Sequence, residues 1–132
     1  MQMEMEITLD GGMKVDASVN GFTIKTDQAK DSGGEGSAPE PFVYYLAAMG
    51  TCAALYVQGF CQTRQIPTQG LKFTQTAVWQ EEPRRLAQVK LGIHLPPEFP
   101  AKYHRAVERA AATCAVKKSI LDPPEFVFEV ME

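Results

Sequence analysis

The stretch that decides the fold is PFVYYLAAMGTCAALYVQGFCQTRQ, residues Pro41–Gln65. It carries no charged side chain before Arg64, and its apolar residues fall all round the helical wheel rather than along one stripe. A helix of this kind is normally buried on most sides. One chain of 132 residues has little other material to cover it. We therefore expect a central helix in a homodimer.

Cys52 lies in the middle of this stretch, between small residues that let a ligand or another backbone approach the sulfur. Cys61 follows nine positions later and, at about 100° per residue, points to the opposite face of the helix. These two therefore cannot pair within an unbroken helix. Cys114 is the third cysteine, and it lies at the start of a helical segment if Thr113 caps that segment. Redox chemistry and inert burial both remain open for the three thiols.

The composition indicates a single soluble, globular domain spanning residues 1–132, with 45% hydrophobic and 22% charged residues. A net charge of -3 argues against nucleic acid as a partner. The start of the chain lacks the apolar core of a signal peptide, and polar residues interrupt the long helix, so we expect a cytoplasmic protein that does not enter membranes. His94 and His104 have no ligands at metal spacing, so no metal or cofactor is expected.

The segments around the helix predict an α+β fold with antiparallel sheets. Alternating apolar and polar residues predict strands, and Asn20-Gly21 predicts a hairpin turn. Helical spacing predicts a second helix from about Ala101, which residues 115–121 either continue or restart. The predicted strands cover residues 1–9, 15–19, 22–26, 71–80 and 87–95, with a closing strand at Phe126–Val130.

The segment Asp27–Glu40, DQAKDSGGEGSAPE, is longer than most connections between elements. Long loops are often functional, and its glycines and serines predict few packing contacts. We therefore expect a mobile border of a substrate pocket. A plain linker into the helix is the alternative.

The order of these segments resembles that of the OsmC/Ohr family of thiol-dependent peroxidases. The residues that carry the resemblance are LAAMGTCAA around Cys52 and AAATCAVKKSIL around Cys114. The resemblance implies an intertwined homodimer, in which sheets from both chains wrap two central helices. It also implies reduction of organic hydroperoxides or hydrogen peroxide. Cys52 is then the peroxidatic cysteine, Cys114 the resolving cysteine, and an external dithiol the reductant.

The chain departs from the family pattern at the groups that surround the thiol. Active members use an N-terminal arginine to stabilise the thiolate, whereas this chain has no arginine before Arg64. Lys14 is the nearest cationic candidate, and Glu40 the nearest carboxylate to the start of the helix. Ala115 follows the second cysteine, where the family usually has proline. We therefore expect a slow peroxidase, or alternatively a protein of this fold that binds a small apolar or thiol-reactive molecule with little turnover.

Overall fold

A computed structural model describes residues 1–132, and its secondary structure mixes helices with antiparallel sheets. This confirms the predicted α+β class. The contacts divide the chain into two compact units, residues 1–47 and 48–132. The single domain inferred from the composition stays a prediction.

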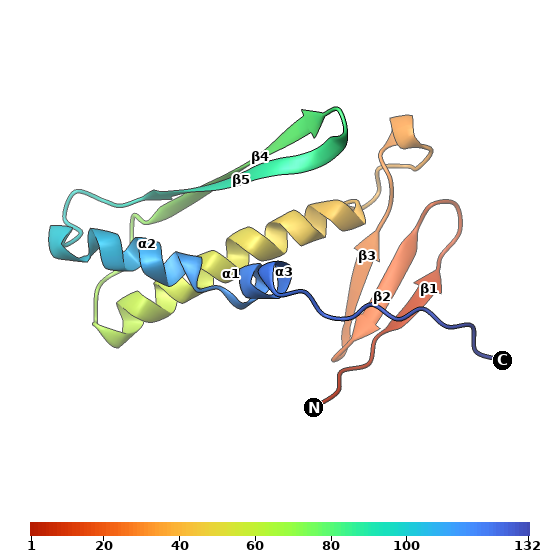
Figure 1. The fold of residues 1–132 in the computed structure, drawn as a ribbon, viewed down its shortest axis with the longest axis horizontal. Helices are drawn as coiled ribbons and strands as arrows, with labels where there is room; N and C mark the ends of the chain where they lie inside the picture. The colour runs from red at the N-terminus through yellow and green to blue at the C-terminus, as the bar shows by residue number, and fades with distance from the viewer. The chain divides into compact units, whose positions relative to one another are not determined.

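The first unit contains a three-stranded antiparallel sheet, as predicted. Its strands β1 (Glu6–Leu9), β2 (Val15–Val19) and β3 (Phe22–Thr26) lie in chain order across the sheet (Figure 1). Asn20 and Gly21 both have positive φ, 50° and 80°. These values suit a two-residue hairpin turn, whose twist matches that of the flanking strands. The register that follows pairs Val19 with Phe22 and extends to Val15 and Thr26.

The segment after β3 is held together by one buried carboxylate, that of Asp27, which is 1% exposed. It accepts hydrogen bonds from the backbone N–H groups of Gln28, Glu35 and Ser37 at 2.7, 3.3 and 3.0 Å. The hydroxyl of Ser37 donates a fourth bond, at 2.6 Å. A 3-10 turn, η1 (Lys30–Ser32), lies inside the loop. The backbone N–H groups of three loop residues and the hydroxyl of Ser37 therefore converge on Asp27, whereas most side chains of the loop are exposed, and a mobile border of a substrate pocket stays a prediction.

Helix α1 (Pro41–Thr63) confirms the predicted central helix to within two residues at its end. Pro41 suits a first helical position, where a backbone N–H has no partner within the helix. The helix ends where Gln65 takes a positive φ of 54° and the N–H of Ile66 donates to the carbonyl of Cys61. None of the helices, α1 included, has both the length and the hydropathy needed to span a membrane.

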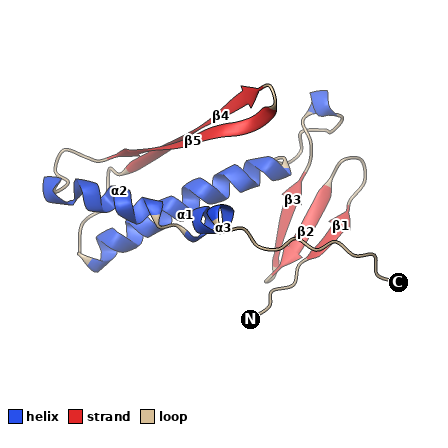
Figure 2. Cartoon of the chain, in the orientation of Figure 1, coloured by secondary structure: helices blue, strands red, loops and turns tan.

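The second unit packs helices against one face of a long hairpin (Figure 2). Strands β4 (Lys72–Glu81) and β5 (Arg84–His94) are antiparallel and joined by the two residues Glu82–Pro83. The apolar side chains that alternate onto the inner face of this hairpin, such as Phe73 and Ile93, pack against a small core. The buried members of that core are Ala53, Val57, Cys61, Phe99, Val107, Ala111 and Cys114.

The second helical region is made of three pieces rather than one. They are η2 (Ala101–Tyr103), α2 (His104–Ala112) and α3 (Ala115–Leu121). Thr113 ends α2, and the cap of α3 is Cys114 itself rather than Thr113. The helix therefore restarts after Cys114, which settles the choice that the sequence left open.

The predicted closing strand at Phe126–Val130 does not form, since residues 122–132 carry no regular structure. Residues 1–5 also lie outside β1. A strand exists only where another strand pairs with its N–H and C=O groups. Within one chain, neither terminal segment has such a neighbour. Alternation alone was therefore not enough to predict these two ends correctly.

Candidate functional site

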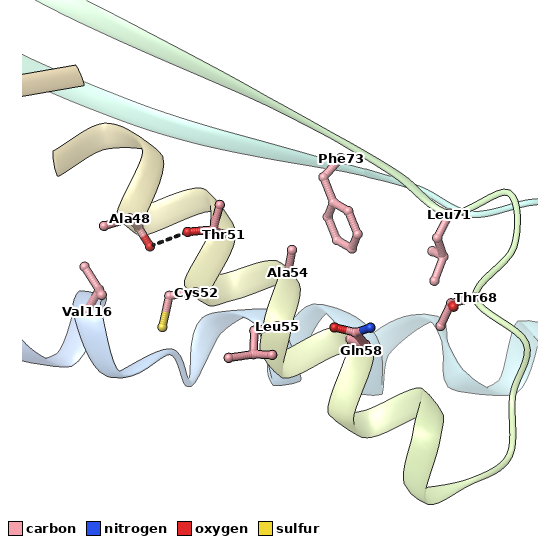
Figure 3. A pocket seen from close by; sticks show the side chains of 10 residues that line it. All are labelled: Ala48, Thr51, Cys52, Ala54, Leu55, Gln58, Thr68, Leu71, Phe73 and Val116. Atoms are coloured by element: carbon pink, nitrogen blue, oxygen red, sulfur yellow. Dashed lines mark hydrogen bonds between the residues drawn. The ribbon is translucent and has the colours of Figure 1, made fainter. Parts of the chain in front are cut away.

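The site is built around Cys52, which α1 carries in the second unit. Its side chain is partly buried and packs against the core. The sulfur points away from the axis of α1, on the side where Val116 of α3 lies (Figure 3). The hydroxyl of the preceding residue, Thr51, donates to the carbonyl of Ala48, about one turn earlier in α1, at 3.5 Å. The small residues around Cys52 therefore leave its sulfur open to a neighbouring cavity.

This first cavity has a volume of about 770 Å³ and opens to the surface. Its lining contains no charged side chain, and only Thr51, Gln58 and Thr68 bring polar side-chain groups besides the thiol. The remaining lining residues, Ala48, Ala54, Leu55, Leu71, Phe73 and Val116, are apolar (Figure 3). Such a site favours an uncharged, largely apolar molecule near the sulfur.

Cys114 lies between α2 and α3 and is only 3% exposed. Its sulfur accepts a hydrogen bond from the backbone N–H of Lys117, at 3.3 Å. The Lys117 ammonium donates to the carbonyl of Ala112 at 3.1 Å and so stays close to the same turn. Cys114 lines a second cavity, of about 290 Å³, which Glu108 and Lys117 also line.

All three cysteines are free thiols in this structure. Cys61 is fully buried in the core, and burial raises the pKa of its thiol while Arg64 opposes the rise. A protonated, enclosed thiol is a poor nucleophile. The structure thus brings Cys52 and Cys114 to cavities and leaves Cys61 in packing.

The other two predicted site residues belong to the first unit. The Lys14 ammonium forms an ion pair with Glu35, which raises the pKa of Lys14. Glu40 precedes α1, and its backbone carbonyl accepts from the N–H of Val43 at 2.9 Å. The first cavity is lined by residues of the second unit. A role for Lys14 or Glu40 beside Cys52 therefore stays a prediction.

Sequence reasoning missed the residues that shape the first cavity from outside α1. Leu71 and Phe73 come from the start of the hairpin, and Val116 from α3. In the sequence, each is an ordinary apolar residue of a strand or helix, so no local pattern indicates that it lines a cavity. Asp27 was also missed, although an aspartate at the start of a loop often accepts hydrogen bonds from nearby backbone N–H groups. No group of three or more metal-binding side chains is present.

The sequence profile described as OsmC-like protein matches residues 34–129. The chain belongs to the OsmC-like family. The match includes both Cys52 and Cys114 and begins after β3. No curated protein matches the chain.

Solved structures share the fold of this OsmC-like chain. A Psychrobacter arcticus 273-4 protein, named for osmotic stress induction and a detoxification response, is 25% identical, with a TM-score of 0.76 over 90% of this chain and 88% of that one. An OsmC-like protein from Mycoplasma pneumoniae is 12% identical, with a TM-score of 0.72 over 93% and 89%. An organic hydroperoxide resistance protein OsmC from Legionella pneumophila is 17% identical, with a TM-score of 0.56 over 89% and 88%.

Proposed function

We propose that this OsmC-like protein is a thiol-dependent peroxidase that reduces organic hydroperoxides. The observation that carries the proposal is the cavity of about 770 Å³ at Cys52, which has a thiol and an otherwise uncharged, mostly apolar lining. The family membership and the name of the Legionella pneumophila protein, organic hydroperoxide resistance protein OsmC, support it. Hydrogen peroxide is the smaller and more polar substrate, and it gains little from apolar walls.

The reaction starts at the sulfur of Cys52. Its thiolate attacks the outer oxygen of the hydroperoxide, the O–O bond breaks, and the alkoxide takes a proton to leave as an alcohol. Cys52 becomes a sulfenic acid. The thiolate of Cys114 then attacks the Cys52 sulfur and displaces hydroxide, which forms a disulfide. A dithiol supplies the two electrons that return both cysteines to thiols.

The two cysteines are suited to these different roles by their surroundings. Cys52 is partly buried beside an open cavity, so a bulky hydroperoxide has room to approach it. Cys114 is almost enclosed, and its sulfur already accepts a hydrogen bond from the N–H of Lys117. Cys114 is the N-cap of α3, so its sulfur lies at the junction between α2 and α3 rather than inside a helix.

The test is the loss of cumene hydroperoxide in the presence of dithiothreitol, followed for the wild-type protein and three single variants. We expect Cys52→Ser to abolish turnover and Cys61→Ser to leave it unchanged. Without dithiothreitol, Cys114→Ser should consume about one equivalent of peroxide and leave a sulfenic acid on Cys52. After one turnover without dithiothreitol, mass mapping should find a Cys52–Cys114 disulfide in the wild-type protein.

Two results would overturn the proposal. Full activity of Cys52→Ser would remove the assigned nucleophile. Binding of cumene hydroperoxide or its alcohol without any thiol oxidation would instead support a protein that binds small apolar molecules. That alternative is tested because this chain lacks the N-terminal arginine that would stabilise a thiolate.

A further inference from the structure

Two cavities of the second unit are each lined by one of the two cysteines assigned to the reaction. Cys52 lines the first cavity with Ala48 and Leu55, and Cys114 lines the second with Met49 and Ala53. At about 100° per residue, Met49 and Ala53 occupy a different face of α1 from Ala48 and Leu55. Helix α1 thus contributes a different face to each cavity.

We propose that the second cavity is the entry site of the dithiol reductant, which attacks Cys114 while peroxide reaches Cys52 through the first cavity. This inference rests on the proposed peroxidase function and adds a separate route for the second half of the reaction. The sulfur of Cys114 accepts the hydrogen bond of Lys117 and lies among the lining groups of the second cavity. A reductant in that cavity therefore meets Cys114 before it meets Cys52.

The dithiol reduces the Cys52–Cys114 disulfide in two steps. One thiolate of the dithiol attacks the Cys114 sulfur, the Cys52–Cys114 bond breaks, and Cys52 leaves as a thiolate. The second thiol then attacks the mixed disulfide. Cys114 leaves as a thiolate, and the reductant departs as a cyclic disulfide. The N–H of Lys117 points at the sulfur that gains negative charge in this last step.

The lining of the second cavity fits a small uncharged dithiol. Its volume of about 290 Å³ is well below that of the first cavity. Apolar side chains such as Leu91 and Ile93 form much of its wall. One ammonium, on Lys117, and one carboxylate, on Glu108, also line it, so the pair leaves no excess charge for an ionic reductant. Dithiothreitol is therefore a suitable probe.

The experiment measures oxidation and reduction separately in variants that carry the same alanine-to-leucine change in one cavity or the other. Ala112→Leu narrows the second cavity, and Ala54→Leu narrows the first. We expect Ala112→Leu to slow reduction of the disulfide by dithiothreitol at least tenfold while oxidation by cumene hydroperoxide changes less than twofold. Ala54→Leu should show the reverse pattern. Ala101 lines neither cavity, so Ala101→Leu should leave the rates of oxidation and reduction as in the wild-type protein.

Reduction of Ala112→Leu at the wild-type rate would overturn the proposal, and so would an Ala54→Leu variant that slows both half-reactions equally. If Ala112→Leu does not fold, as judged by circular dichroism, Ile120→Trp gives the same test from α3. Ile120 is 40% exposed and lines the second cavity, so a larger side chain is tolerated there.

The disulfide is prepared both with cumene hydroperoxide and with diamide. If only diamide produces it, the proposed peroxidase function fails. The route of reduction is still measured on the diamide product. Failure of the route and failure of the function therefore give different results.

Discussion

Among single residues, Asp27 has a carboxyl group whose pKa lies well below its ordinary value. The hydroxyl and N–H of Ser37, followed by the N–H of Gln28, hold the pKa of this carboxyl at about 2. Its ordinary value is about 3.9, so folding favours the ionised form. The resulting contribution to the free energy of unfolding is complete above pH ~4 and is lost as the pH falls toward 2.

Asp27→Asn should therefore lower the free energy of unfolding at pH ~6, and its deficit relative to wild type should shrink between pH ~4 and ~2. Urea unfolding followed by circular dichroism measures both curves. Ser37→Ala removes one donor and keeps the carboxylate, so its deficit should shrink only in part. Parallel pH curves for the wild-type protein and Asp27→Asn would contradict this account.

Lys14 is the second residue with a testable charge. If it stabilises the Cys52 thiolate, Lys14→Ala should slow alkylation of Cys52 by iodoacetamide several-fold. Glu35→Gln is the matched control, because it releases Lys14 from its ion pair and should speed the same reaction. The measurement uses a background with serine at Cys61 and Cys114. Equal rates in all three proteins would leave Lys14 as a structural ion pair of the first unit.

At the scale of elements, α1 contains two glycines whose surroundings differ. A Cβ at Gly59 meets no atom within 4 Å, whereas a Cβ at Gly50 lies 2.7 Å from Oε1 of Gln75. Glycine inside a helix costs about 0.5–1 kcal/mol relative to alanine. Gly59→Ala should raise the free energy of unfolding by about that amount, and Gly50→Ala by less because the Gln75 side chain must move. Chemical denaturation measures the difference. A destabilised Gly59→Ala would show that another surface packs there.

Most elements could be predicted from the sequence, because their signals are local. The Asn20-Gly21 turn fixes the register of β2 and β3, and the long uncharged run fixes α1. The strand at Phe126–Val130 was wrong because pairing depends on a neighbour, which no local pattern specifies. The organisation of the loop by Asp27 was missed for a related reason, since its donors meet only after the chain turns.

The candidate site was predicted in part. Cys52 and Cys114 could be singled out because small neighbours and a helix start are visible in the sequence. The two cavities could not, since Leu71 and Phe73 come from the start of the hairpin, Val116 comes from α3, and all three are ordinary apolar residues. The separation of the cysteines between two cavities depends on the faces of α1, and only the three-dimensional structure combines those faces with their neighbours.

At the scale of the whole molecule, the single chain leaves many apolar side chains uncovered. Leu55 on α1 is 60% exposed, and Phe126 and Phe128 near the C-terminus are 73% and 93% exposed. Soluble monomers rarely leave so much apolar surface uncovered. These residues support the prediction of a homodimer, in which the partner covers α1 and pairs with the terminal segment.

Sedimentation velocity at micromolar concentration should therefore find a dimer. Removal of residues 123–132 should raise the dimer dissociation constant at least tenfold, because burial of a single phenylalanine contributes about 1.5–3 kcal/mol. A full-length variant with Glu125→Gln and Glu129→Gln keeps the apolar side chains and should remain dimeric. A stable full-length monomer of 14.6 kDa would contradict the prediction.

The complete burial of Cys61 has a practical consequence. In a variant with serine at Cys52 and Cys114, it is the sole thiol, and a reagent reaches it only when the core opens. When closing is faster than labelling, the labelling rate divided by that of an unprotected cysteine gives the fraction of open molecules. A mass shift on one residue then reports conformational stability at nanomolar concentration or in a crude extract, without denaturant. The same thiol would show, ligand by ligand, which compounds keep the core closed.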